Sequence, residues 1–317
     1  MNEALKEEER MRRSNCLAAC LFALVLSICA VCSHEARAQQ EGLTRIADNV
    51  YSYVDVKQSG PQNSYGANAG IVIGENGILV IDTLISSIEA KRFIKDIRAI
   101  SDKPIKYVVN THYHLDHTFG NSEFEKLGAV IISHTSDRMN SLRHSEAVLK
   151  NIKSYGLTEK DMEGTAITYP ALTFNDRMEV DLGDQTIHLI YTKPSHTAGS
   201  IIVYLPNKKV LFVGDILFTN FHPFMADGDI RGWVNVLDYI LALDVDKIIP
   251  GHGPISSKKD IQDMKKYLIA FDKKARQLSA KSKDADFIAA EMKKAMPPRA
   301  EGEWLIKANI QMKYLKK

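Results

Sequence analysis

The sequence predicts a single α/β domain that spans residues 39–317. Short apolar segments alternate with segments of helical spacing, which is the pattern of sheets covered by helices. No repeat, low-complexity tract or Ser- or Pro-rich linker divides this region. The 317-residue chain is 25% charged and 45% hydrophobic, a balance typical of globular proteins rather than of disordered or fibrous ones.

Residues 1–38 are predicted to be a cleaved signal peptide. Arg12 and Arg13 precede an apolar run over residues 17–31, and the small-x-small cleavage signal Ala36-Arg37-Ala38 follows it. The apolar run has about 15 residues, whereas a membrane-spanning helix needs about 20. We therefore expect a periplasmic or secreted protein that keeps no stable membrane anchor.

Two features of this leader leave alternatives open. Residues 1–10 carry four glutamates, which is atypical of a leader, so Met11 is an alternative start and residues 1–10 an artefact of start-site assignment. A retained anchor, or lipidation at Cys20, is the other reading. All four cysteines lie in the leader: Cys16, Cys20, Cys29 and Cys32. A mature chain from residue 39 has none, so its metals must be held by His and carboxylate side chains.

The predicted strands are short apolar segments bounded by turn residues. They lie at residues 50–56, 69–73, 77–81, 106–109, 130–133, 178–182, 187–191, 200–205, 210–214 and 247–249. The first two are joined by a loop over residues 57–68, which contains Gly60, Pro61 and Gly66.

The predicted helices lie between these strands. Residues 86–100 have helical spacing, and Pro104 follows their end. Their apolar face is expected to contain Ile88, Phe93, Ile94, Ile97 and Ile100. Further helices are predicted at residues 144–155, at residues 230–243 and through the Lys- and Ala-rich segment 257–317.

A dense polar motif follows the strand at residues 106–109. It reads Asn110-Thr111-His112-Tyr113-His114-Leu115-Asp116-His117. Alternation along an extended chain points His112 and His114 the same way. A turn after His114 would direct Asp116 and His117 to a second point nearby. One loop therefore has the donors for two adjacent metal sites.

Three further donors also stand at strand ends. His196 precedes the strand at residues 200–205, Asp215 follows the strand at residues 210–214, and His252 follows the strand at residues 247–249. Each alone is a weak signal, but a single sheet edge can gather all of them with the motif. Asp82 ends another strand and is expected either to hold a ligand imidazole by its free N–H or to cap the helix at residues 86–100.

These motifs occur in an order that resembles the metallo-β-lactamase superfamily over roughly residues 45–255: His-x-His-x-Asp-His, His-Thr-x-Gly-Ser, Gly-Asp and Pro-Gly-His-Gly. The resemblance implies a four-layer αβ/βα sandwich with the site at one edge of two sheets. It implies one metal on His112, His114 and His196, a second on Asp116, His117 and His252, and Asp215 as the bridge. The all-His/Asp set resembles glyoxalase II, lactonases and related hydrolases.

The implied activity is a hydrolysis with two zinc ions per chain, iron being possible. Metal-bound hydroxide would attack an ester, thioester, lactone or cyclic amide of a small-molecule substrate. Asp116 is a candidate to orient the nucleophile and pass its proton to the leaving group. Candidate substrate contacts are Tyr65, Asn220 and His222. A net charge of +2 and the lack of a basic stripe argue against a nucleic-acid partner.

Other functions on the same fold remain open. A periplasmic β-lactamase fits the predicted export, but Asp215 in the bridging place is uncommon in that group. A lactonase is less favoured, since Phe218 stands where some lactonases have tyrosine. A mononuclear iron persulfide dioxygenase keeps the His-rich motif. Flavodiiron proteins have glutamate where His114 stands, and a non-catalytic metal-binding protein would not need the complete donor set.

Overall fold

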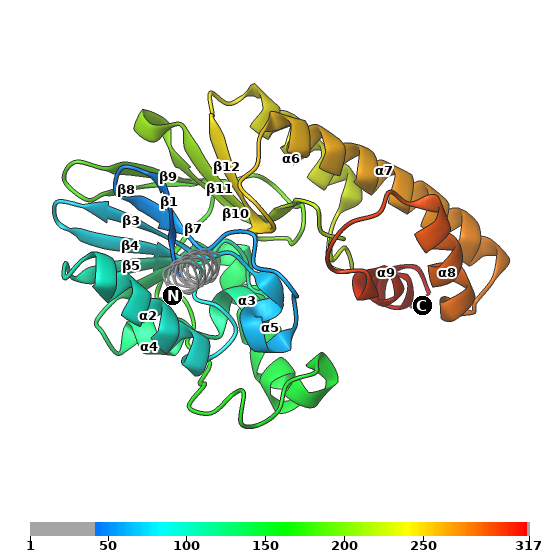
Figure 1. Ribbon diagram of the computed structural model, residues 1–317, viewed down its shortest axis with the longest axis horizontal. Coiled ribbons are helices and arrows are strands. Elements are labelled where there is room, and N and C mark those ends of the chain that lie inside the picture. Colours follow the sequence, from blue (N-terminus) through cyan, green and yellow to red (C-terminus); the bar gives the residue numbers. More distant parts are fainter. Residues whose placement is uncertain (1–41, 316–317) are drawn as a thin grey trace, which may run out of the picture. The chain divides into compact units, whose positions relative to one another are not determined.

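The computed structural model describes residues 42–315, so the predicted leader at residues 1–38 lies outside the described residues. Within the unit Leu43–Lys317, two β-sheets pack face to face between helices (Figure 1). The first sheet has seven strands in the order β1-β2-β3-β4-β5-β6-β7, and the second has five in the order β12-β11-β10-β9-β8. This is the four-layer αβ/βα sandwich.

The strands are bounded as follows: β1 Thr44–Ala47, β2 Val50–Ser52, β3 Gly70–Gly74, β4 Gly77–Ile81, β5 Ile105–Val109, β6 Val130–His134, β7 Leu172–Phe174, β8 Arg177–Asp181, β9 Thr186–Tyr191, β10 Ile201–Leu205, β11 Val210–Phe218 and β12 Lys247–His252. Pairs β4–β5, β5–β6, β6–β7 and β11–β12 are parallel. Parallel strands place their carboxyl ends at one edge of the sheet; the motif at residues 112–117 follows β5 and His252 ends β12. Asp215 lies within β11, and His196 lies in the loop between the antiparallel strands β9 and β10.

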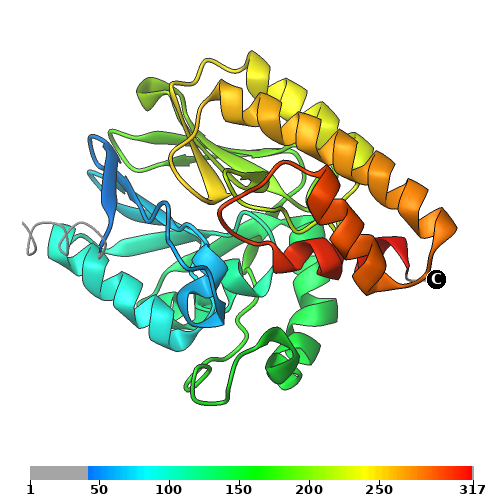
Figure 2. The same ribbon diagram turned by 45° about the vertical axis from the view of Figure 1, so that its right-hand side comes forward.

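The helices are α2 Ser87–Ile100, α3 Leu115–Thr118, α4 Asn121–Glu125, α5 Thr135–Lys150, α6 Ile230–Ala242, α7 Lys258–Lys281, α8 Ala285–Ala295 and α9 Trp304–Asn309. Four short irregular helices accompany them: η1 Pro61–Gly66, η2 Ile152–Tyr155, η3 Pro206–Lys208 and η4 Ile310–Tyr314. Turned by 45°, the molecule shows α7, α8 and α9 in succession along one side (Figure 2).

Three apolar cores explain the layering. The central core lies between the two sheets and includes Leu79 and Val203. A second core joins the outer face of the seven-stranded sheet to α2 and α4 through Phe93 and Phe124. The third core joins the five-stranded sheet to α6 and α7, with Trp233 fully buried. Each sheet is therefore covered on both faces, and strands such as β3 and β4 are buried along their whole length.

Strand β4 shows how sequence sets this arrangement. All five of its residues are buried. Successive side chains of a strand point to opposite faces, so Ile78 and Val80 join the helix-covered core while Leu79 and Ile81 join the central core. A one-residue shift in pairing would exchange these faces, and the register is thereby fixed.

Several predicted boundaries are wrong. The strand predicted at residues 50–56 ends at Ser52. The helix predicted at residues 144–155 is α5, which begins at Thr135. The prediction missed this start because α5 buries polar residues such as Ser141 and Ser145, which leave no apolar periodicity in the sequence. Strand β11 continues past Gly214 to Phe218, and β12 includes His252.

The predicted apolar face of α2 is correct only in its middle. Phe93 and Ile97 are fully buried, whereas Ile88 and Ile100 are 46% and 37% exposed. The helix covers the sheet through its central turns, and its two ends extend beyond that contact. Strands β1 and β7 were not predicted, because both are edge strands with few buried residues.

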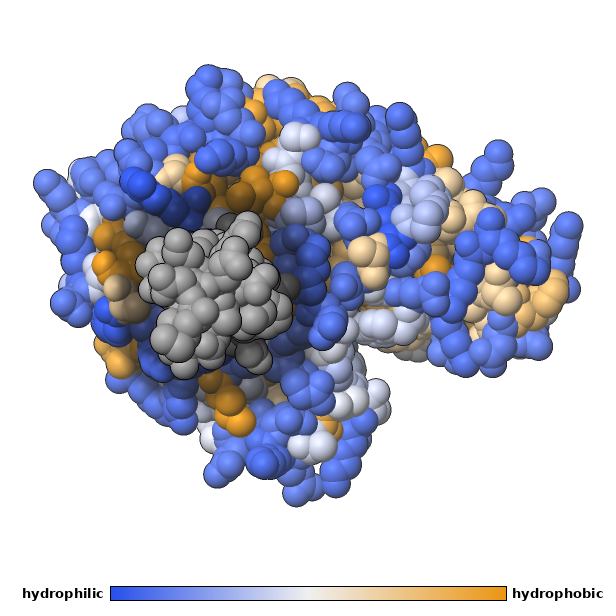
Figure 3. All heavy atoms as spheres, viewed as in Figure 1, coloured by the Kyte–Doolittle hydropathy of each residue, from blue (hydrophilic) through white to orange (hydrophobic). Residues whose placement is uncertain are grey.

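Hydrophilic side chains cover most of the face in Figure 3, and apolar residues form small patches between them. Across residues 42–315, none of the helices has the length and apolar character that crossing a membrane requires.

Candidate metal centre

The His-rich motif leaves the seven-stranded sheet at the carboxyl end of β5. His112 lies in a bend directly after β5, His114 has extended backbone, and the one-turn helix α3 then begins at Leu115 with His114 as its N-cap. The predicted turn after His114 is therefore present. It places Asp116 and His117 in the single turn of α3.

Four donors form a first cluster, named cluster 1: His112, His114, His196 and Asp215. Their potential ligand atoms all lie within 4.8 Å of one another. His196 Nε2 is 3.0 Å from His114 Nδ1 and 3.4 Å from Asp215 Oδ2. His112 Nε2 is 3.7 Å from the same carboxylate oxygen. Three imidazoles and one carboxylate thus converge on one point.

Three donors form a second cluster, named cluster 2: Asp116, His117 and His252. His252 Nε2 is 3.3 Å and His117 Nε2 is 3.5 Å from Asp116 Oδ2. Asp215 Oδ1 lies 3.2 Å from His117 Nε2 and 3.4 Å from His252 Nε2. The two oxygens of Asp215 therefore face different clusters, which is the position of a bridging carboxylate.

The backbone of the parallel pair β11–β12 presents Asp215 and His252. The register between the two strands shifts on both sides of Gly214, a bulge that redirects the following side chain. Gly214 has φ +49°, and a Cβ there would lie 2.5 Å from Thr111 Oγ1. A Cβ on Gly251 would lie 1.9 Å from Asp215 Oδ1. Glycine at both positions lets Asp215 approach the donors that come from β5.

The donor atoms fit a metal. His112 Nε2, His117 Nε2 and Asp215 Oδ1 are buried without a hydrogen-bond partner of good geometry. Orphaned buried polar atoms are costly in a folded protein, and imidazole and carboxylate donors without thiolate suit zinc and other divalent first-row metals. The two clusters bring together all seven residues that the sequence singles out as donors.

Groups outside the clusters orient the imidazoles. Asp82 is 2% exposed, and its Oδ2 lies 2.9 Å from His117 Nδ1. Asp82 also accepts hydrogen bonds from the Thr111 backbone N–H and hydroxyl, both at 2.7 Å, and Thr111 Oγ1 is 3.1 Å from His112 Nδ1. One carboxylate thus supports an imidazole of each cluster. The helix-cap alternative for Asp82 is wrong, because Ser86 caps α2.

Two further orienting groups were not predicted. The Tyr65 carbonyl oxygen is 3.2 Å from His252 Nδ1. Asp227 Oδ2 is 2.8 Å from His114 Nε2 and accepts a hydrogen bond from the Tyr113 hydroxyl at 2.7 Å. The sequence alone does not show that Asp227 orients a histidine while the nearby Asp229 caps α6.

The two clusters differ in their protonation. Burial lowers the pKa of His112 well below its ordinary value and lowers the pKa of His196 to about 3. Burial would also lower the pKa of His252, but the carboxylates of Asp215 and Asp116 outweigh it and raise that pKa to about 9. The same carboxylates raise the pKa of His117 against burial. Without metal, the shifted pKa values therefore favour the protonated form of His117 and His252 and the neutral form of His112 and His196.

The predicted substrate contacts lie in different surroundings. The Tyr65 ring packs on Trp304 with centroids 5.6 Å apart, beside the clusters. Asn220 Oδ1 accepts a hydrogen bond from the Ala300 backbone N–H at 3.2 Å. His222 is buried with its Nδ1 2.6 Å from the Tyr267 hydroxyl, the arrangement of a packed core histidine. Of the three, only Tyr65 has a described contact with a cluster residue.

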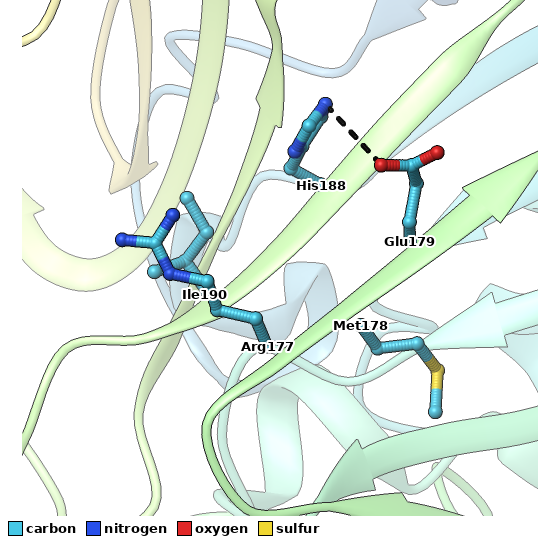
Figure 4. A pocket seen from close by; sticks show the side chains of 5 residues that line it. All are labelled: Arg177, Met178, Glu179, His188 and Ile190. Atoms are coloured by element: carbon cyan, nitrogen blue, oxygen red, sulfur yellow. Dashed lines mark ion pairs between the residues drawn. The ribbon is translucent and has the colours of Figure 1, made fainter.

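A separate surface pocket has no part in the clusters. It is lined by Arg177, Met178, Glu179, His188 and Ile190 on β8 and β9 (Figure 4). His188 Nε2 lies 3.9 Å from Glu179 Oε2, and both side chains are substantially exposed. His188 is a surface residue, as expected for a histidine outside the motifs.

Two curated relatives share part of the sequence. The chain is 25% identical over 192 residues to 2,4-dinitroanisole O-demethylase subunit alpha of Nocardioides sp. (strain JS1661), covering 60% of this chain and 53% of that protein. It is 26% identical over 221 residues to linear primary-alkylsulfatase of Pseudomonas sp. (strain ATCC 19151), covering 59% and 42%. The chain thus matches about half the length of these two relatives.

A solved structure shares the fold. The metallo-beta-lactamase from Pontibacter korlensis superposes with a TM-score of 0.58 at 19% identity, covering 71% of this chain and 97% of that one.

An αβ/βα sandwich with His/Asp clusters at the sheet edge is an arrangement that can hold metal ions. The profile of the metallo-beta-lactamase superfamily matches residues 64–252, more than half of the chain. The chain belongs to this superfamily. All seven predicted donors lie inside the matched region, whereas α7, α8 and α9 follow it.

Proposed function

We propose that this protein is an exported, zinc-dependent hydrolase that cleaves an ester, thioester, lactone or cyclic amide bond in a small molecule. The observation that carries the proposal is the position of Asp215. Its Oδ2 is 3.4 Å from His196 Nε2 and its Oδ1 is 3.4 Å from His252 Nε2. A carboxylate that faces two sets of donors suits two neighbouring metal ions.

Zinc, when bound, supplies a hydroxide nucleophile at neutral pH and polarises the scissile carbonyl. The residues of the chain hold and orient these partners. Asp82 and Thr111 fix the imidazoles of His117 and His112, so that their inner nitrogens keep free lone pairs. Donors fixed in this way need little rearrangement when substrate binds.

Asp116 is the proposed proton carrier. Its Oδ2 lies 3.3 Å from His252 Nε2, and its side chain is 10% exposed, against 4% for Asp215. The Asp116 carboxylate can therefore meet both the attacking water and the leaving group. The surrounding groups support the anionic form, since His117 and His252 lower the pKa of Asp116 despite its burial. An anionic carboxylate accepts the proton of the nucleophile and returns it to the leaving group.

The aromatic side chains near the two clusters favour a substrate with an apolar part. The Phe224 ring centroid is 5.4 Å from that of His114, and Tyr65 with Trp304 forms a pair beside His252. Trp304 is 52% exposed. We propose Tyr65, rather than Asn220 or His222, as the substrate contact among the three predicted residues.

The test is metal analysis joined to a substrate screen. Purified protein loaded with zinc is assayed on ester, thioester, lactone and β-lactam substrates, and bound metal is counted by elemental analysis. We expect about two metals per chain and turnover of at least one ester, thioester or lactone. A protein with two zinc ions and no turnover on any of these classes would contradict the proposal, as would a single iron with oxygen uptake on a persulfide.

A β-lactamase is the second candidate, because the solved structure with a TM-score of 0.58 carries that name. Nitrocefin and a carbapenem separate the two candidates. Turnover of these substrates above that of simple esters would favour the β-lactamase.

Export is proposed from the leader predicted at residues 1–38. N-terminal sequencing of protein from the periplasm or the medium tests it. A mature N-terminus at Gln39 supports the proposal, and full-length protein confined to the cytoplasm contradicts it.

A further inference from the structure

We infer that the C-terminal helix α9 and the following η4 hold cluster 1 in shape: Asn309 and Lys313 fix the loop at residues 223–228, from which Asp227 orients His114. This inference rests on the proposed function, since it takes cluster 1 as a metal site. The three positioning residues lie outside the predicted donor set. Figures 1 and 2 both place the red C-terminal helices next to the chain that follows β11.

Asn309 joins α9 to this loop. The residue is 1% exposed. Its Oδ1 accepts a hydrogen bond from the Met225 backbone N–H at 2.6 Å, and its Nδ2 donates to the Pro223 carbonyl oxygen at 2.8 Å. A carboxamide offers both a donor and an acceptor, and here each satisfies a backbone group. An apolar residue in its place would leave both groups buried without partners.

Lys313 holds the other end of the loop. Its Nζ donates to the Gly228 carbonyl oxygen at 2.6 Å and lies 3.5 Å from that of Ala226. These two carbonyls flank Asp227. The backbone on both sides of Asp227 is therefore tied to η4, and the direction of its side chain is set from the C-terminal segment.

Asp227 transmits this constraint to cluster 1. His114 presents Nδ1 to the cluster, 3.0 Å from His196 Nε2, and presents Nε2 to Asp227 Oδ2 at 2.8 Å. A carboxylate on the outer nitrogen keeps the proton there and leaves the inner lone pair for a metal. Tyr113 donates its hydroxyl to the same oxygen of Asp227 and keeps the carboxylate in place.

Cluster 2 is supported differently. The carboxylate that orients His117 is Asp82, which is buried directly after β4 and bonded to Thr111. Among residues 42–315, Asp82 makes no hydrogen bond or ion pair with the loop at residues 223–228. Asp227, by contrast, has a side chain that is 41% exposed and is positioned only by its loop and by Tyr113. Loss of the contacts that Asn309 and Lys313 make with this loop is therefore expected to weaken cluster 1 and to leave cluster 2 intact.

The experiment measures zinc affinity at one cluster at a time by competition with a chromophoric chelator. His252→Ala isolates cluster 1, and His196→Ala isolates cluster 2. On the first background, Asp227→Ala is expected to weaken zinc binding about 10- to 100-fold, the usual effect of removing an orienting partner. Asn309→Ala and Lys313→Met are expected to act in the same direction with smaller factors. On the second background, all three are expected to leave the affinity unchanged.

Lys307→Met is the matched control for Lys313→Met. Lys307 lies on the same C-terminal segment, but its Nζ pairs with Asp286 at 2.6 Å and not with the loop. Asp227→Ala removes an exposed side chain, so this variant tests the inference even if Asn309→Ala fails to fold. Wild-type zinc affinity of Asp227→Ala at cluster 1, or equal losses at both clusters, would overturn the inference.

These outcomes are separable from those of the proposed function. A wild-type protein that binds two metals but cleaves none of the substrates would contradict the proposed hydrolase. The zinc affinities of the variants would still decide the role of Asp227. A wild-type protein that takes up no metal at cluster 1 overturns both.

Discussion

Gly251 leaves open the space that the carboxylate of Asp215 occupies. A Cβ on Gly251 would lie 1.9 Å from Asp215 Oδ1 and 2.7 Å from the Asp215 backbone N. The two residues stand side by side on the parallel strands β11 and β12. Because Asp215 faces both clusters, the position of its carboxylate in the metal centre requires a glycine at residue 251 in β12.

Gly251→Ala is therefore expected to weaken metal binding at both clusters by about tenfold or more, and to lower stability by about 1–3 kcal/mol through overpacking. The φ of Gly251 lies outside the left-handed region, so the backbone itself accepts alanine. Gly60→Ala is the control, because its Cβ would meet no atom closer than 3.7 Å. Elemental analysis and thermal unfolding measure the two effects, and wild-type values for both would refute the packing argument.

Asp116→Asn is expected to lower kcat by about 10²–10⁴-fold, the usual contribution of a general acid–base group. The amide keeps the size of the side chain but does not accept the proton, so the fold and its unfolding temperature should be retained. Asp48→Asn makes the same chemical change at an exposed residue whose partner is Arg45. Turnover like that of the wild type in Asp116→Asn would show that another group carries the proton.

His196→Ala is expected to lower bound metal towards about one ion per chain, because cluster 1 loses a donor whose Nε2 lies 3.0 Å from His114 Nδ1. His188→Ala is the matched control, since His188 lies on the surface beside Glu179. Metal content is counted after dialysis. An unchanged two-metal stoichiometry would remove His196 from the ligand set.

Metal uptake is expected to depend on pH at cluster 2 and much less at cluster 1. The pKa of His252 is raised to about 9, against the burial that alone would lower it, so at pH 7 a metal must displace a proton there. His112 and His196 are neutral at pH 7, because burial lowers the pKa of each. Affinity at cluster 2 should therefore rise between pH 7 and pH 9, by about tenfold per pH unit for each proton released.

Titration calorimetry in buffers of different ionisation enthalpy measures this proton release, with His252→Ala and His196→Ala separating the clusters. Equal slopes of affinity against pH for the two clusters would contradict the assignment of the protonated imidazoles.

The sequence was sufficient for the parts of the fold that local pattern determines. The five apolar residues of β4 and the buried middle of α2, with Phe93 and Ile97, could be predicted from the sequence. The start of α5 could not, because the polar residues Ser141 and Ser145 fill its buried face. Burial of these residues depends on partners from elsewhere in the chain, so no local apolar periodicity indicates it.

The same division holds at the site. The seven donors were predictable because imidazoles and carboxylates recur at strand ends in a known order. Asp227 was not, because its contact with His114 spans 113 residues and its direction depends on Asn309 and Lys313. Long-range hydrogen bonds between loops leave no periodic trace in a sequence.

Each cluster takes its donors from both sheets. His112 and His117 follow β5 of the seven-stranded sheet, whereas Asp215 and His252 belong to β11 and β12 of the five-stranded one. During synthesis, the donors of cluster 1 are complete once β11 has been made and those of cluster 2 only once β12 has been made, and neither set can come together until the two sheets have docked. The compartment in which that docking finishes decides which metal ions the newly formed centre first meets.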